Sequence, residues 1–189
     1  MIGTSDIADV VSSHECSGDE ASYRRAVELL DADQPSWHRS AFEPGHFTAS
    51  GFVASPDRGS LLLIHHGKLD RWLQPGGHFE AVDASVEDAA RREVLEETGV
   101  GDLTRVGSAL VRIDAHRIPA RGEEPMHTHF DLGVGFLATS ESIGPIDEVL
   151  DARWVRFEQL ANYEVDEALL GGARILREMM TDEGENRKS

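Results

Sequence analysis

The sequence predicts an α/β protein built on a mixed β-sheet flanked by helices, with a helical extension ahead of the main domain. Strand-like and helix-like stretches follow one another without a strict strand–helix–strand alternation, which is typical of a mixed sheet. The chain has 189 residues, 40% of them hydrophobic and 28% charged, which suffices for one globular domain with a sizeable core. Helix-like apolar spacing comes first, and strand-like runs begin near residue 46.

The first 45 residues predict a helical extension. Residues 1–17 are polar and are expected to be partly ordered. Apolar residues at helical spacing predict a helix over Asp19–Leu30. The connector that follows contains Trp37 and Phe42, which we expect to pack against the main domain. This segment is too short to bury a core of its own, so we interpret it as an extension of the main domain.

Two strand-like runs, residues 46–55 and 60–66, flank the turn sequence PDRG and predict a β-hairpin. Gly51, within the first run, indicates a bulge or the close approach of another segment. A further strand is predicted over residues 102–114, ahead of a polar loop that begins at His116.

The clearest strand covers residues 126–138, where side chains alternate between the two faces of the sheet. Its apolar face carries Phe130, Leu132, Val134 and Phe136, and its other face carries His127, His129 and Asp131. A short strand over 152–157 and an amphipathic helix over 167–180 follow. The main domain is therefore predicted to span 46–181, and residues 182–189 predict a disordered tail.

Three glutamates, Glu93, Glu96 and Glu97, lie within two turns of a helix predicted to begin after Ser85 and to end at Gly99. A helix advances about 100° per residue, so the three carboxylates share one face. Like charges at this spacing each cost a few tenths of a kcal/mol, and the face is unfavourable unless a cation lies among them. Hard oxygen ligands of this kind suit Mg²⁺ or Mn²⁺.

A glycine turn, Gly76-Gly77, precedes this helix. Glycine lets the backbone approach a ligand closely, and the turn offers free carbonyl groups. A metal clamp requires this combination of a tight turn and a helix that presents carboxylates. A solvated acidic helix face is the alternative interpretation, but it does not account for the glycine turn or for Arg92 directly before the first glutamate.

The stretch from Gly76 to Val100 resembles the Nudix box, G-x5-E-x7-R-E-U-x-E-E-x-G-U, in which U is aliphatic. Its second half, REVLEETGV at residues 92–100, matches throughout. In the first half, five residues after Gly77 lead to Asp83 where the family has glutamate, and eight residues instead of seven then lead to Arg92. We interpret this departure as a one-residue insertion in the loop before the helix, with Asp83 in place of the family's first glutamate.

The resemblance covers about residues 48–176 and implies an α/β/α sandwich with the box helix against the sheet. It also implies metal-dependent cleavage of a pyrophosphate linkage in nucleoside diphosphates joined to another group. In that chemistry Glu93, Glu96 and Glu97 would bind Mg²⁺ or Mn²⁺, with the carbonyl of Gly76 as a further ligand. Arg92 would hold a box carboxylate in place.

The general base has two candidates. Glu93 is one, because a carboxylate among several others has a raised proton affinity and can take a proton from water. Some family members use an acidic residue in a later loop, and Glu148 is the best candidate there, with Asp147 and Glu141 as alternatives.

The predicted substrate contacts are less specific. Lys68 and Arg71 precede the glycine turn and are the nearest cations in the sequence for substrate phosphates. His78 directly follows the glycines, whereas His127 and His129 share a strand face and could contact a phosphate or a base. The H-x-H-x-D array could instead bind Zn²⁺, and ordinary surface residues are an open alternative for every one of these side chains.

Charge and cysteine content narrow the classes of partner. The formal net charge of −17 repels nucleic acid and anionic membrane surfaces, so we expect a small nucleotide-type substrate held by metal ions and local cations. A single cysteine, Cys16, excludes an internal disulfide and fits the cytoplasm. No signal sequence and no membrane-length apolar run is present. The extension could mediate a homodimer.

Three functions compete. The first is a Mg²⁺-dependent Nudix pyrophosphohydrolase acting on a nucleoside polyphosphate or a nucleoside diphosphate derivative. The alternative is a non-catalytic sensor that binds a nucleotide or metabolite on the same fold. The intact helical glutamates favour the enzyme, and the altered first half of the box favours the sensor. A diphosphate isomerase ranks last, because Cys16 lies outside the core region.

Overall fold

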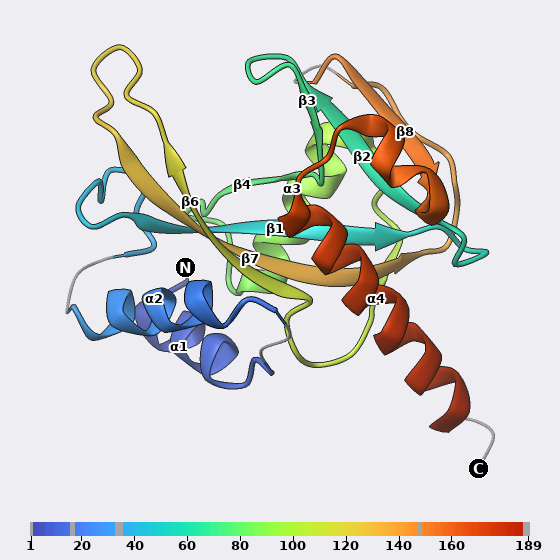
Figure 1. The fold of residues 1–189 in the computed structure, drawn as a ribbon, viewed down its shortest axis with the longest axis horizontal. Helices are drawn as coiled ribbons and strands as arrows, with labels where there is room; N and C mark the ends of the chain where they lie inside the picture. The colour runs from blue at the N-terminus through green and yellow to red at the C-terminus, as the bar shows by residue number, and fades with distance from the viewer. Residues whose placement is uncertain (1, 16–17, 33–35, 147–148, 187–189) are drawn as a thin grey trace.

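The computed structural model describes residues 2–15, 18–32, 36–146 and 149–186, and it has a mixed β-sheet between layers of helices (Figure 1). This confirms the predicted α/β/α sandwich. The elements are α1 (Thr4–Ser12), α2 (Glu20–Asp31), β1 (His46–Ala54), β2 (Ser60–His66), β3 (Arg71–Leu73), β4 (Gly76–His78), α3 (Val86–Thr98), β5 (Leu103–Arg105), β6 (Arg112–Ile118), β7 (His127–Ala138), β8 (Asp151–Arg156), the 3₁₀ helix η1 (Phe157–Tyr163) and α4 (Glu167–Asn186).

Strand β1 is the centre of the sheet. It pairs in parallel with β7 along its whole length, from His46 opposite His129 to Ala54 opposite Leu137. The antiparallel strand β4 pairs with the first half of β1, and β6 and β5 pair with β7. The predicted hairpin exists only at its turn, where Ala54 pairs with Leu61, because β2 then pairs with β8 and β3.

The two faces of β1 pack against different helices. Phe47, Ala49 and Val53 belong to a core shared with α1, α2 and α3, whereas Phe52 and Ala54 belong to a core shared with α4 and η1. This alternation is the period of two expected for a strand that is buried on both faces. In Figure 1 the helix pair α1–α2 (blue) and helix α4 (red) lie apart from each other beside the sheet.

Within the described residues, the N-terminal segment contains the helix α1, which agrees with the partial order expected for residues 1–17. Helix α1 buries Ile7 and Val11 completely, four residues apart on one face, in the same core as the α3 residue Val86. The backbone N–H of Ile2 also donates to the carbonyl of Asp83 at 2.8 Å. The extension therefore packs against the box helix and the loop that precedes it.

Truncation of Val11 to alanine is expected to lower the free energy of unfolding by about 2 kcal/mol, since it removes buried methyl groups and leaves a cavity. Val82→Ala is the matched control, because Val82 is 75% exposed whereas Val11 is fully buried. Urea denaturation of both variants measures the difference. Equal midpoints for the two variants would contradict the view that α1 belongs to the cooperative core.

Two predicted boundaries differ from the structure. The predicted strand over 102–114 is divided into β5 and β6, because Gly107 adopts a φ of 63° and the guanidinium of Arg105 binds the carbonyl groups of Ser108 and Ala109. Strand β6 then continues to Ile118, beyond the predicted start of the loop.

The predicted disordered tail is helical over residues 182–186, because α4 continues to Asn186. Residues 187–189 lie outside the described part of the chain. The preceding turn is held by Met180, which is buried and whose carbonyl accepts a hydrogen bond from Arg58 at 2.9 Å. This long-range contact is invisible in the polar sequence of the tail.

Candidate active site

Helix α3 presents the predicted glutamates as expected from its sequence. The Ser85 side chain caps it by accepting from the backbone N–H of Asp88 at 3.0 Å, and Gly99 ends it with a φ of 71°. Its buried face packs on β1, where a Cβ at Gly51 would overlap Val94, so the predicted close approach at Gly51 is confirmed. The glutamate ridge consists of Glu93, Glu96 and Glu97. Glu93 and Glu97 lie against Gly76-Gly77, whereas Glu96 is exposed and binds Arg92.

The predicted tight turn at Gly76-Gly77 is wrong, because these residues are extended and belong to strand β4, which pairs antiparallel with β1. Strand β4 lies directly against two of the predicted carboxylates. The N–H of Gly76 donates to Oε2 of Glu97 at 2.9 Å, and Glu97 is only 6% exposed. A Cβ at Gly77 would lie 2.5 Å from Oε1 of Glu93, closer than real Cβ contacts allow. Glycine at position 77 therefore lets the Glu93 carboxylate approach the backbone of β4.

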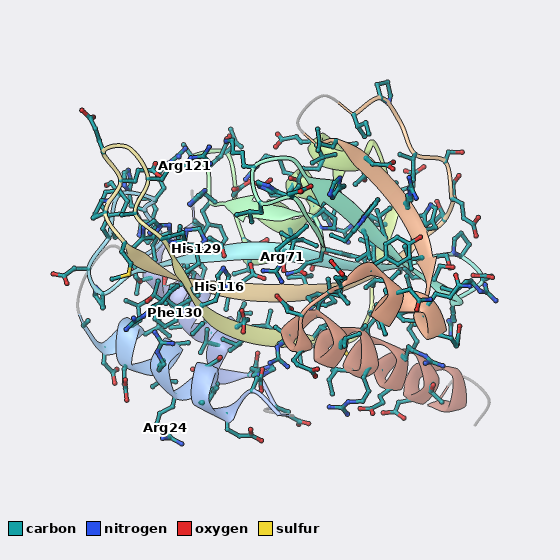
Figure 2. The ribbon with its side chains drawn as sticks, turned by 45° about the horizontal axis from the view of Figure 1, so that its top comes forward. Arg24, Arg71, His116, Arg121, His129 and Phe130 are labelled. Carbon is teal, nitrogen blue, oxygen red and sulfur yellow. The ribbon has the colours of Figure 1, made fainter. Side chains whose placement is uncertain are left out.

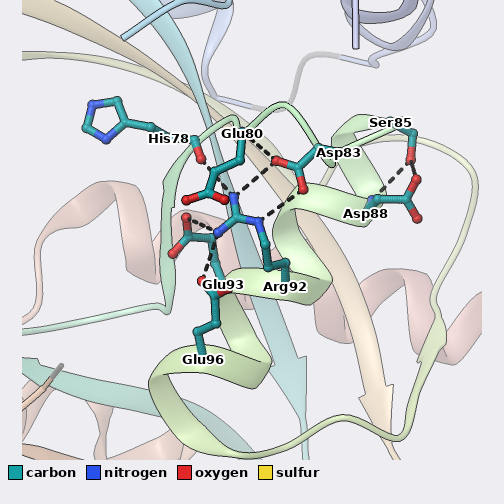
Figure 3. A network of polar contacts seen from close by, with 8 residues as sticks. All are labelled: His78, Glu80, Asp83, Ser85, Asp88, Arg92, Glu93 and Glu96. Carbon is teal, nitrogen blue, oxygen red and sulfur yellow. Dashed lines mark hydrogen bonds and ion pairs between the residues drawn. The ribbon is translucent and has the colours of Figure 1, made fainter. Parts of the chain in front are cut away.

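Arg92 is the centre of the polar network around these glutamates (Figure 3). Its Nε and Nη2 donate to the two oxygens of Asp83 at 3.0 and 3.1 Å. Its Nη1 donates to Glu93 at 3.0 Å and to Glu96 at 2.8 Å, and Nη2 also donates to the carbonyl of His78 at 2.9 Å. One guanidinium thus ties the box helix to the end of β4 and to the preceding loop.

Asp83, at the position where the box departs from its family pattern, is the anchor of Arg92. Its side chain is 2% exposed, and it also accepts from the backbone N–H of Glu80 at 2.7 Å. Burial alone would lower the pKa of Arg92, but the hydrogen bonds to Asp83 and the charges of Glu93 and Glu96 outweigh it and raise that pKa. The guanidinium is therefore a permanent cation, and the inserted residue leaves the bidentate pair intact.

The other predicted site residues are more scattered. Lys68 is exposed in the turn between β2 and β3, and Arg71 on β3 donates to Asp166 at 3.1 Å, toward the start of α4 (Figure 2). Glu141 contributes its carbonyl to the indole N–H of Trp154 at 2.9 Å. Glu148 and Asp147, the loop candidates for the general base, lie outside the described residues.

The three predicted histidines come together with a fourth that sequence reasoning did not assign. This fourth residue is His46, at the start of β1. Its ring centroid lies 5.1 Å from that of His78, 5.0 Å from that of His127 and 4.7 Å from that of His129. Figure 2 shows His129 beside His116, at the end of the sheet that carries the loop with Arg121. The parallel register of β1 and β7 produces this cluster, and that register cannot be read from local patterns.

Burial lowers the pKa values of three of these imidazoles. Burial, followed by the charges of neighbouring imidazoles, lowers the pKa of His129 to about 2 and that of His78 to about 4. Burial also lowers the pKa of His46. Asp131, the acid of the H-x-H-x-D array, has other partners, because its carboxylate accepts hydrogen bonds from Thr48 at 2.9 Å and from Ser50 at 2.6 Å. Burial raises the pKa of Asp131.

The two candidate metal-binding groups differ in how far they are preformed. Among the described residues, the one group of three or more His, Cys, Asp or Glu side chains whose ligand atoms converge within 4.8 Å is His46, His127 and His129. Of the glutamates, Glu93 and Glu96 share the Arg92 guanidinium, and Glu97 accepts from the N–H of Gly76. The three carboxylates and the adjacent backbone of β4 nevertheless form an oxygen-rich donor set that fits Mg²⁺.

Comparison with known proteins agrees with this description. The family model for the NUDIX domain matches residues 45–178. The fold resembles a Nudix hydrolase from M. smegmatis, RenU, at a TM-score of 0.52 and 21% identity over 72% of this chain and 86% of that one. It also resembles a NUDIX-family hydrolase from Clostridium perfringens, at 0.50 and 25% over 71% and 97%. No curated protein matches the sequence.

A third similar structure is the NUDIX domain of Shewanella oneidensis NrtR in complex with ADP-ribose, at a TM-score of 0.50 and 17% identity over 82% of this chain and 97% of that one. The fold and the box define a hydrolase of the class that acts on phosphoanhydride bonds. The chain belongs to the Nudix family. No helix in the part of the chain that the structure describes is long and apolar enough to cross a membrane.

Proposed function

We propose that this protein is a Mg²⁺-dependent Nudix pyrophosphohydrolase of the cytoplasm. Its substrate would be a nucleoside polyphosphate or a nucleoside diphosphate linked to another group, cleaved at a phosphoanhydride bond. The observation that carries the proposal is the placement of Glu93 and Glu97 on α3 directly against Gly76-Gly77, with Glu96 joined to Glu93 through Arg92.

The glutamates and the Gly76 carbonyl would hold Mg²⁺, with Mn²⁺ as an alternative in the same place. When bound, the metal supplies charge neutralisation for the phosphates and lowers the pKa of water. The chain's own residues position the ligands. The N–H of Gly76 orients the Glu97 carboxylate, and Arg92 orients Glu93 and Glu96.

Glu93 is suited to accept the proton of the attacking water. Its carboxylate lies against the backbone at Gly77 and is mostly buried, with a side chain 12% exposed. A carboxylate in this place can take a proton from water, which is the role of a general base. Glu148 is the alternative base, and the same assay on Glu93→Gln and Glu148→Gln distinguishes them.

The substrate phosphates would lie at the open side of this ridge. Lys68 and Arg71 are the proposed cations for them, and His78, His127 and His129 are the proposed neutral contacts. Burial keeps the pKa values of His78 and His129 low, so these two imidazoles would act as hydrogen-bonding groups without a positive charge.

A nucleotide panel tests the proposal. The protein is incubated with Mg²⁺ and nucleoside triphosphates, dinucleoside polyphosphates and nucleoside diphosphate sugars, and release of phosphate or pyrophosphate is followed. ADP-ribose belongs in the panel, because a structurally similar NUDIX domain binds it. We expect metal-dependent turnover of at least one compound. Tight nucleotide binding without turnover of any compound would instead support the sensor.

A further inference from the structure

His46, His127 and His129 converge in a way that the proposed substrate contacts of His127 and His129 do not require. His46 begins β1 and lies opposite His129 in the parallel β1–β7 register, and His127 lies on the same face of β7. Their ligand nitrogens all lie within 4.8 Å of one another. We propose that His46, His127 and His129 form a second metal site, separate from the glutamate ridge, that binds Zn²⁺.

The hydrogen bonds of two of these histidines fix the tautomer that a metal ligand needs. Nδ1 of His46 is 3.1 Å from the carbonyl oxygen of Ala41, and Nδ1 of His127 is 2.8 Å from that of Pro125. A carbonyl oxygen can only accept, so each Nδ1 must carry the hydrogen. The lone pair is thereby left on Nε2. Metal-binding histidines commonly have this second hydrogen bond, which orients the ring.

Nε2 of one of these histidines has no hydrogen-bond partner, and the Nε2 atoms of the other two share one hydrogen bond. Nε2 of His46 is buried without a hydrogen-bond partner. Nε2 of His127 is 3.1 Å from Nε2 of His129. In a tetrahedral Zn²⁺ site with ordinary bond lengths, two ligand nitrogens lie about 3.3 Å apart, close to this separation. One cation between the three rings would replace the hydrogen bond between His127 and His129 and would give Nε2 of His46 a partner, with His129 presenting a lone pair at Nε2.

The chemistry of the donors selects the metal. Three imidazoles without a carboxylate suit Zn²⁺ and similar transition metals, whereas Mg²⁺ prefers oxygen. The nearest acid on this strand face, Asp131, is already bound by Thr48 and Ser50.

The site lies beside the proposed catalytic centre. The ring of His78 is 5.0 Å from that of His129, while the carbonyl of His78 accepts from Arg92, and Figure 3 shows this ring pointing away from the guanidinium. His46 and His127 are buried, but His129 is partly exposed. Three protein ligands leave a fourth position open for water or an anionic oxygen, reachable past His129.

Metal titration of the untagged protein tests this inference without an activity assay. Chelator-stripped protein is dialysed against Zn²⁺ in excess Mg²⁺, and bound metal is measured by mass spectrometry. Co²⁺ is titrated in parallel, because its visible spectrum reports tetrahedral coordination. We expect about one Zn²⁺ per chain, retained in excess Mg²⁺, and an intense tetrahedral Co²⁺ spectrum.

Variants then locate the bound ion. His127→Gln and His129→Gln are expected to lose the Zn²⁺ and the Co²⁺ spectrum, whereas the exposed His38→Gln keeps both. The double variant Glu96→Gln/Glu97→Gln keeps them as well, which separates this site from the glutamate ridge. A folded wild-type protein that binds no Zn²⁺ and gives no tetrahedral Co²⁺ spectrum would overturn the inference, as would loss of Zn²⁺ only in the glutamate variant.

Discussion

Replacement of Glu97 by glutamine is expected to lower kcat about 10²- to 10³-fold on the best substrate of the panel. A metal ligand supports transition-state stabilisation of several kcal/mol, and each 1.4 kcal/mol is about tenfold in rate. Glutamine has the same shape and keeps a carbonyl oxygen that can accept from the N–H of Gly76, so the fold should be preserved. Steady-state kinetics over a range of Mg²⁺ concentrations measures the change.

Glu87→Gln is the matched control for that variant. Glu87 lies on the same helix but is not part of the glutamate ridge, and it pairs with Arg91 at 2.6 Å. Its rate should stay within a few-fold of the unmodified protein. If Glu97→Gln retained full activity at saturating Mg²⁺, the ridge would not be the catalytic metal site.

Replacement of Arg92 by alanine is expected to lower the free energy of unfolding by about 3–5 kcal/mol, the usual effect of removing one partner of a buried ion pair. The Arg92 side chain is only 14% exposed, and without it Asp83 would be a buried carboxylate with one remaining backbone donor, from Glu80. Urea denaturation gives the loss. Activity should fall as well, because Glu93 and Glu96 lose their shared donor.

Two comparisons isolate the cause. Arg174→Ala removes an exposed pair with Glu178 on α4 and should cost at most about 0.5 kcal/mol. The double variant Arg92→Ala/Asp83→Ala should be less destabilised than the sum of the single variants, since the unpaired carboxylate is removed too. Strict additivity would show that the two side chains are not coupled.

Local patterns were sufficient to predict the centre of the candidate site. The positions of Ser85, the three glutamates and Gly99 determine where the helix begins, which face is acidic and where it ends, and all of this depends on residues within one short segment. The ordered structure of the N-terminal segment, by contrast, depends on tertiary packing, which local patterns do not reveal. Helix α1 has two fully buried residues, Ile7 and Val11, whose partners on α3 lie far along the chain.

Long-range register explains what sequence reasoning missed at the site. His46 looked like the first residue of an ordinary strand, and its position opposite His129 follows only from parallel pairing with β7. The function of Asp83 was equally open, because spacing in a loop does not reveal which arginine it can reach. The structure shows the loop folded so that Asp83 meets Arg92 in spite of the extra residue.

The parallel pairing of β1 with β7 also has a consequence for biosynthesis. It joins residues such as Thr48 and Asp131, which are 83 positions apart, and closing so long a loop is slow because the entropic cost precedes the stabilising contacts. The box helix lies inside that loop and leaves the ribosome before β7 does. A nascent chain therefore cannot complete its central sheet until β7 has emerged, and the cluster of His46, His127 and His129 cannot form before then either.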